Sequence, residues 1–121
     1  MSAMKLVIAG ADGQLGTDMA RLLAPLAAVT ALTFHDLDVT DRAVLRQAVD
    51  VFGPDVVVNC AAWTAVDRAE TEPDAAYRVN VLGASNVAQA AERVGARVVY
   101  FSTDYVFDGV ATEPYDEEAL T

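Results

Sequence analysis

The sequence lacks the features that mark several large classes of protein. It contains one cysteine, Cys60, so it can form neither an internal disulfide nor a multi-cysteine metal site, and we expect Cys60 to be a small core residue. The single histidine, His35, has no histidine partner for a metal, and we expect it in a surface turn. No apolar run approaches about 18 residues, and the N-terminus lacks the pattern of an export signal. We therefore expect no metal and no membrane, and we place the protein in the reducing cytoplasm.

Basic residues are also scarce. Eight Lys and Arg residues stand against 18 Asp and Glu residues, which gives a formal net charge of −10. Such a charge repels nucleic acids and anionic membranes, so neither is an expected partner. A dinucleotide is an anion too, and this chain would have to hold it with backbone N–H groups. The 121 residues are 54% hydrophobic, which suits one compact domain over residues 1–121.

Three glycines join an apolar strand to a helix near the start of the chain. The strand is expected over Lys5–Ala9 and the helix over Gln14–Leu23, with Gly10, Gly13 and Gly16 between and inside them. In such a turn the glycines allow a tight bend, a close approach of a pyrophosphate to the backbone, and close packing of helix on strand. The spacing alone is weak evidence, because an ordinary glycine-rich loop can show it. The strand before the glycines and the helical spacing after them favour a nucleotide-binding turn.

Strand and helix signals alternate along the rest of the chain. Further strands are expected over residues 29–34, 55–60 and 97–101, and helices over 42–51 and 73–94. Thr40 is the expected N-cap of the first of these helices, and the long second helix should run unbroken to Gly95. This alternation predicts an α/β fold, a Rossmann-like doubly wound parallel sheet. With about four strands and their flanking helices, the sheet would be incomplete.

Polar or small residues follow each expected strand, at the edge where parallel sheets bind ligands. Asp36 and Asp38 follow the second strand, where an acid commonly contacts the adenosine ribose, although either could be a solvated turn residue. Small residues over 59–62 would let a ribose or nicotinamide approach, or could merely pack. Hydroxyls, a carboxylate and a phenol over 102–105 follow what we expect to be a buried strand. They suit hydrogen bonding to a reacting carbonyl, or a turn capped by Asp104.

Four of these segments together resemble one known family. They are Gly10-Ala-Asp-Gly-Gln-Leu-Gly16, Asp38-Val-Thr-Asp41, Asn59-Cys-Ala-Ala-Trp-Thr-Ala-Val-Asp67 with Glu70, and Ser102-Thr-Asp-Tyr-Val-Phe-Asp-Gly109. In this order they are similar to the N-terminal part of the dTDP-4-dehydrorhamnose reductases, which are extended short-chain dehydrogenases/reductases. The Ser-Thr-Asp-Tyr-Val-Phe run is far more specific than the glycines.

The resemblance implies a binding site for NADPH or NADH, without separating the two. The pyrophosphate would lie on the glycine turn, the adenine beside Asp38 and Val39, and the rest of the cofactor along the segment after the third strand. The implied cofactor-binding residues are Gly10, Asp12, Gly13, Gln14, Leu15, Gly16, Asp38, Val39, Cys60, Ala61, Ala62 and Ser102.

The resemblance also implies a reaction, the reduction of the C4 keto group of a dTDP-4-keto-6-deoxy sugar in dTDP-L-rhamnose biosynthesis. Thr103 would be the catalytic hydroxyl that hydrogen-bonds the keto oxygen. The substrate-binding residues would be Thr64, Asp104 and Tyr105. Asn80 and Gly83 match an Asn-x-x-Gly that such enzymes carry in this helix, whereas Trp63 is assigned no chemistry.

One departure from the family limits this expectation. Its members carry a later Tyr-x-x-x-Lys pair, which donates the proton and holds the nicotinamide ribose, but Lys5 is the only lysine here and precedes every tyrosine. The chain therefore looks cut off before that pair and before the sugar-binding part, and we expect it to be inactive or nearly so. The alternative is a non-catalytic NAD(P)-binding or regulatory module that acts through a protein partner. An uncovered sheet edge would also favour a homo-oligomer.

Overall fold

A four-stranded parallel sheet forms the centre of the computed structural model, which describes residues 2–121. Its strands lie in the order β2-β1-β3-β4. Their bounds are β1 Lys5–Ala9, β2 Ala28–Leu32, β3 Val56–Asn59 and β4 Arg97–Tyr100. The order requires crossovers between parallel neighbours, which is the doubly wound arrangement that the alternation predicted. The expected four-strand α/β fold is thus confirmed, and β2 ends two residues earlier than expected.

The register of the sheet brings the carboxyl ends of all four strands level. Ala9 of β1 pairs with Leu32 of β2 on one side and with Asn59 of β3 on the other, and Asn59 pairs with Tyr100 of β4. The segments that follow these four residues therefore leave the sheet from the same edge, as the sequence predicted.

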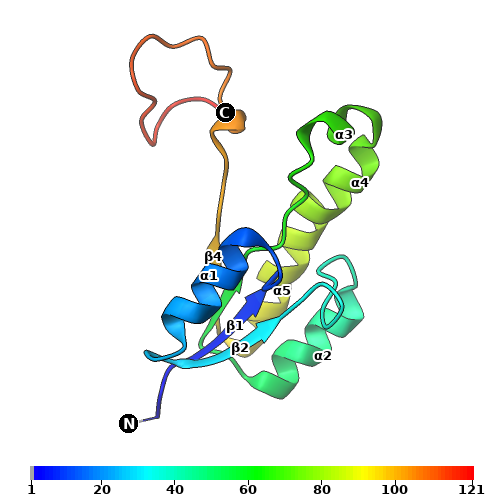
Figure 1. The fold of residues 1–121 in the computed structure, drawn as a ribbon, viewed down its shortest axis with the longest axis vertical. Coiled ribbons are helices and arrows are strands. Elements are labelled where there is room, and N and C mark those ends of the chain that lie inside the picture. Colours follow the sequence, from blue (N-terminus) through cyan, green and yellow to red (C-terminus); the bar gives the residue numbers. More distant parts are fainter. Residues whose placement is uncertain (1) are drawn as a thin grey trace.

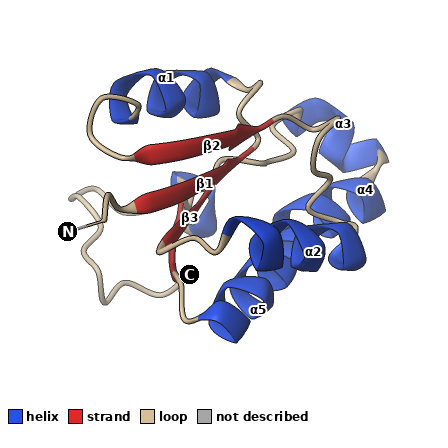
Figure 2. Cartoon of the chain, turned by 90° about the horizontal axis from the view of Figure 1, so that it is seen from below, coloured by secondary structure: helices blue, strands red, loops and turns tan. Residues whose placement is uncertain are grey.

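Helices cover both faces of the sheet (Figures 1 and 2). Helix α1 (Gln14–Leu23) packs against β1 and β2 on one face, whereas α2 (Arg42–Phe52) and α5 (Ala84–Val94) lie together on the other. Because side chains alternate across a strand, β1 contributes side chains to the packing on both faces of the sheet. The larger core lies between the sheet and the helix pair, and its buried residues include Val7, Ala9, Val57, Leu45, Val49 and Val87.

Helix α2 begins at Arg42, as the sequence predicted, but a different residue caps it. Asp41, rather than Thr40, is the N-cap, because its carboxylate accepts hydrogen bonds from the N–H groups of Ala43 at 3.0 Å and Val44 at 3.1 Å. The hydroxyl of Thr40 instead donates to Asp38. The helix ends at Gly53, whose φ of 52° provides the left-handed cap.

The expected long helix is continuous in space but not in its hydrogen bonding. After α3 (Val66–Thr71), the chain forms α4 (Pro73–Tyr77), then the π-helical segment η1 (Arg78–Gly83), and then α5. The prediction of one unbroken helix is therefore wrong in the middle. A π-helical turn takes in one extra residue, often at functional sites, and no residue type marks it in a sequence.

Strand β4 is an edge strand, and its surroundings differ from what the sequence led us to expect. A buried strand was expected, but Val99, Tyr100 and Phe101 are exposed, at 41%, 51% and 42%. The chain beyond β4 runs away from the sheet as an extended arm, residues 101–121, which contains only the short 3-10 turn η2 (Asp104–Val106) (Figure 1). None of the helices within residues 2–121 has the length and hydropathy needed to cross a membrane.

Candidate functional site: the loops at the carboxyl edge of the sheet

The glycine loop lies directly on the segment that follows β3. Gly10 has a φ of +72°, and a Cβ there would lie 2.6 Å from the backbone nitrogen of Ala61. At Gly16 a Cβ would overlap the carbonyl oxygen of Gly10. These two positions require glycine for the fold itself, because a side chain would push apart the loop, the helix and the β3 segment.

Gly13 differs from the other two glycines of this loop. Its φ is −77°, which any residue can adopt, and a Cβ would meet only the Gly10 carbonyl oxygen at 3.4 Å, an ordinary contact. Neither backbone strain nor a close contact therefore requires glycine at this exposed position. The open side of Gly13 is instead where a ligand could approach the backbone closely.

The first turn of α1 offers hydrogen-bond donors beside Gly13. Within residues 2–121, the N–H groups of Gln14 and Leu15 have no acceptor, as is usual for the first residues of a helix. Both residues are exposed, and the first turn carries no acidic side chain. A phosphate fits this combination of free N–H groups, helix dipole and an open glycine.

Hydrogen bonds join the glycine loop to the end of β2. Ala11 N–H donates to the Leu32 carbonyl at 3.0 Å, and the Asp12 carboxylate accepts from Phe34 N–H at 3.1 Å. The structure thus shows the Asp12 carboxylate in a structural contact.

The two aspartates after β2 both hold turns. Asp36 accepts from the N–H and the hydroxyl of Thr33, each at 2.9 Å, and this turn is why β2 ends at Leu32. These bonds, chiefly the one from the backbone N–H, lower the pKa of Asp36. Asp38 accepts from the N–H of Thr40 at 2.9 Å and from its hydroxyl at 2.8 Å. Asp36 and Asp38 can each hold a turn and still contact a ligand, because one oxygen of each carboxylate has no partner among the described residues.

Val39 lies deeper than the sequence indicated. Its side chain is 3% exposed and belongs to the core, and it fills the space that a Cβ on Gly83 would need. Its carbonyl accepts from the Asn86 side chain at 3.0 Å. The side chain of Val39 therefore packs inside the protein, and only its backbone is placed to border a ligand.

Asn59 ends β3 with a buried and partly unsatisfied amide. The residue is 3% exposed, and its Oδ1 accepts from Ala61 N–H at 3.1 Å, while Nδ2 has no hydrogen-bond partner in the described structure. Buried amides are usually fully bonded, so the free donor indicates a group still to be bound at this strand end. Burial also raises the pKa of the neighbouring Cys60 thiol, which disfavours the nucleophilic thiolate. Cys60 is partly buried, so it is less enclosed than a core residue.

Asn80 is a positioning residue that sequence reasoning noted but did not explain. From the π-helical segment η1, its Oδ1 accepts from Trp63 N–H at 2.8 Å and its Nδ2 donates to the Trp63 carbonyl at 3.1 Å. The Trp63 ring is further held by its Nε1–H bond to the Ala65 carbonyl and by the Arg68 guanidinium, 5.0 Å from its centroid. This clamp fixes the loop that contains Ala61 and Ala62.

The expected catalytic segment lies in the arm. Thr103 Oγ1 accepts from Tyr105 N–H at 3.2 Å and donates to the Asp104 carboxylate at 3.3 Å. Among the described residues, no hydrogen bond joins 101–121 to residues 2–100. The structure therefore brings the glycine loop, the β2 turn and the β3 loop together, whereas Ser102, Thr103, Asp104 and Tyr105 leave the same edge but remain exposed. Thr64 is also exposed, in the loop before α3.

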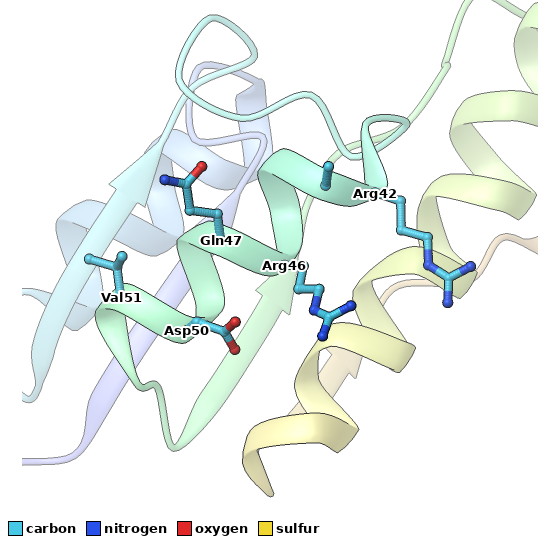
Figure 3. A pocket seen from close by; sticks show the side chains of 6 residues that line it. Arg42, Arg46, Gln47, Asp50 and Val51 are labelled. Atoms are coloured by element: carbon cyan, nitrogen blue, oxygen red, sulfur yellow. The ribbon is translucent and has the colours of Figure 1, made fainter.

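A further candidate feature lies outside this site. A surface hollow follows α2 and is lined by Arg42, Ala43, Arg46, Gln47, Asp50 and Val51 (Figure 3). It is lined by residues of α2 alone and takes in none of the expected site residues. Within residues 2–121, no group of three or more His, Cys, Asp or Glu side chains is arranged to hold a metal ion.

The parallel sheet, the glycine loop at the start of α1 and the β3 loop packed on it define a Rossmann-type nucleotide-binding protein. The family model described as the RmlD substrate binding domain matches residues 4–121. The chain belongs to this family, which confirms the resemblance inferred from its motifs.

Curated relatives and solved structures agree with that assignment. The chain is 51% identical over 116 residues to the dTDP-4-dehydrorhamnose reductase of Streptomyces griseus, covering 95% of this chain and 38% of the relative. It is 47% identical over 116 residues to the dTDP-4-keto-6-deoxy-D-glucose reductase of Streptomyces niveus, covering 95% of this chain and 40% of the relative. The crystal structure of dTDP-4-dehydrorhamnose reductase from Bacillus anthracis in complex with NADP superposes with a TM-score of 0.95 at 42% identity, over 99% of this chain and 43% of that one. The chain thus spans about two fifths of the length of these proteins.

Proposed function

We propose that this chain supplies the NAD(P)H-binding part of a dTDP-4-dehydrorhamnose reductase, one that reduces the C4 keto group of a dTDP-4-keto-6-deoxy sugar. The observation that carries the proposal is the open, unstrained Gly13 beside the free N–H groups of α1, because neither backbone strain nor a close contact requires glycine there. The names of the relatives support the substrate, a dTDP-linked deoxy sugar. We also propose that residues 1–121 form one cofactor-binding domain and that the protein works in the cytoplasm.

Different residues of this site would contact different parts of NADPH or NADH. The N–H groups of Gln14 and Leu15 would bind the pyrophosphate, with Gly13 leaving room for it. The clamped loop with Ala61 and Ala62 would line the inner part of the site, and the unpaired Nδ2 of Asn59 is a donor available there. When bound, the nicotinamide would supply a hydride to the sugar.

The arm would supply the polar contacts to the sugar. The Thr103 hydroxyl would hydrogen-bond the keto oxygen, which it can do once released from Asp104. Asp104, Tyr105 and Thr64 would bind the rest of the sugar nucleotide. The 121 residues contain no Tyr-x-x-x-Lys pair to donate the proton, so we expect the chain by itself to bind cofactor but to turn over substrate at a negligible rate.

Substitution of Gly13 tests the cofactor site with little risk to the fold. Trp63 fluorescence should report saturable binding of NADH or NADPH by the purified chain. Gly13→Ala should weaken that binding by about tenfold or more, because the methyl group occupies the phosphate's approach, while the urea midpoint falls only slightly, since alanine is a poorer N-cap for α1 than glycine. Gly53→Ala, far from this site, is the matched control and should leave affinity unchanged. A folded chain that binds neither dinucleotide would contradict the proposal, as would a Gly13→Ala variant of full affinity.

The exposed edge of β4 favours a further proposal, that the isolated chain forms homo-oligomers. The outer edge of β4 is unpaired, and exposed Val98 and Val99 within the strand and Phe101 just after it add apolar surface, so this edge offers both backbone partners and apolar contacts to a second copy. Light scattering during gel filtration should show species larger than the 12.8 kDa chain, in proportions that rise with concentration. A monomer at every concentration would refute it.

A further inference from the structure

The end of β2 carries carboxylates close to where the adenosine end of a dinucleotide would lie. Asp36 is held by Thr33 in the turn that directly follows β2, and Asp12 is bonded to the next residue of that turn, Phe34. Both aspartates are exposed. The hydrogen bonds from Thr33 favour the ionised form of Asp36. Two negative charges thus flank the path from the glycine loop to the end of β2.

No lysine or arginine among the described residues forms an ion pair with Asp12 or Asp36, and the one basic side chain beside Asp36 is that of His35. Arg21 is in the last turn of α1, away from the glycine loop, and pairs with Asp18 at 3.2 Å. Lys5 is at the opposite end of β1. Arg42 and Arg46 extend from α2 on the side of α5, not on the side of β2 (Figure 3).

The turn itself carries two rings, those of Phe34 and His35, and neither lysine nor arginine. Phe34 is 59% exposed, and the His35 ring packs edge-on against it with centroids 5.9 Å apart. The backbone of Phe34 is fixed by Asp12, so position 34 presents its side chain from a defined turn. A flat apolar ring suits an adenine or an uncharged ribose, and it offers nothing to a phosphate.

In Rossmann-type folds an acid after the second strand binds the ribose 2′-hydroxyl of NAD, whereas the 2′-phosphate of NADP requires a cation in its place. We infer that this site discriminates against the 2′-phosphate and takes NADH in preference to NADPH. The inference rests on the proposed function and makes it more specific. It also sets this chain apart from the Bacillus anthracis structure, which contains NADP.

Parallel titrations with NADH and NADPH test the inference on the chain as it is. At pH 8, where histidine is ordinarily neutral, and at about 20 mM salt, NADH should bind about tenfold more tightly, and the ratio should shrink by about 0.5 M salt because the repulsion is screened. Equal affinities, or tighter binding of NADPH, would overturn the inference while leaving the dinucleotide site intact. Binding of neither by a folded chain would overturn the proposed function, and the inference with it.

Variants in the turn after β2 test whether the preference for NADH arises there. Phe34→Arg should raise NADPH affinity about tenfold with little change for NADH, because the new cation sits where the 2′-phosphate is expected. Asp36→Asn should also reduce the preference for NADH over NADPH, by a smaller factor than Phe34→Arg does. Glu117→Gln, an equal change of charge in the arm, should leave the ratio of the two affinities as it is in the parent chain. If Phe34→Arg and Glu117→Gln behave alike, the discrimination does not arise at the end of β2 and the inference fails.

Discussion

The glycine loop, the turn after β2 and the β3 loop leave the sheet from the same edge as the arm. The loops and the arm are nevertheless held in different ways. The glycine loop is bonded to β2 and packed on the β3 loop, and the β3 loop is clamped by Asn80 from a helix 17 residues further along the chain. The arm has only bonds to itself, among them the Tyr115 hydroxyl to Asp108 at 2.7 Å and the stacking of Phe107 on Tyr115 at 4.4 Å.

This difference separates the two halves of the proposed chemistry. The part that would hold the cofactor is rigid because its bonds span distant segments of the sequence, so it can be formed before any ligand arrives. The part that would hold the sugar has local order only. A stable cofactor site on a chain of negligible activity is the result that this arrangement predicts, and the following changes test it.

The largest difference in stability between the two regions should come from substituting one leucine in each. Leu45, on α2, is 0% exposed, whereas Leu120, in the arm, is 93% exposed. Leu45→Ala should lower the free energy of unfolding by about 3 kcal/mol, because it leaves a cavity in the core, and Leu120→Ala should change it by less than about 0.5 kcal/mol. Equilibrium urea unfolding measures both. Equal effects would mean that the arm packs against the body in solution.

A smaller loss of stability should follow from the addition of a methyl group at Gly10. Gly10→Ala combines a left-handed backbone with overlap on the Ala61 backbone, and should cost about 2–3 kcal/mol. Gly53 also has a positive φ, but a Cβ there would meet no atom within 4 Å, so Gly53→Ala should cost only about 1 kcal/mol. The difference between the two midpoints in urea isolates the close approach of the glycine loop to the β3 loop. No difference would argue against that packing.

Loss of the Asn80 clamp should have a moderate effect on stability and a visible effect on Trp63. Asn80→Ala leaves the partly buried Trp63 backbone without two partners and should cost about 1–2 kcal/mol. The fluorescence maximum of Trp63 should shift as the loop loosens, and dinucleotide affinity should fall. Asn80→Asp, which keeps the acceptor, should recover part of the affinity, whereas Gln89→Ala on the exposed side of α5 should change nothing. Unaltered affinity in Asn80→Ala would limit the clamp to a role in stability.

The smallest effect is expected in the arm and concerns Asp108. The Tyr115 hydroxyl, followed by Val110 N–H, holds the pKa of Asp108 below its ordinary value of 3.8. Since the folded pKa is depressed, this contact favours the ordered arm above pH 3.8 and is lost as the pH falls through the lower, folded value. In Tyr115→Phe, a carboxyl NMR titration should show the pKa of Asp108 moving up towards 3.8, with the urea midpoint unchanged. An unmoved pKa would show that the arm's turn does not form in solution.

Local chemistry in the sequence determined much of this protein. The strand over Lys5–Ala9 and the helix over Gln14–Leu23 were predicted at their observed bounds, because an apolar run and a helical spacing are local signals. The ends at Gly53 and Gly95 were also readable, since both caps need a positive φ. The family motifs led to the right family, whereas the roles of the individual site residues are still predictions.

Only the folded structure decided the features that depend on which groups come to lie side by side. It made Asp41 the cap of α2, because Thr40 is engaged by Asp38, and it exposed β4, because strand order left that strand at an edge. It also set Asn80 against Trp63 through a π-helical turn that no local pattern marks. A sequence states which groups are available, but which of two neighbouring acceptors or faces is used depends on what the fold brings beside them.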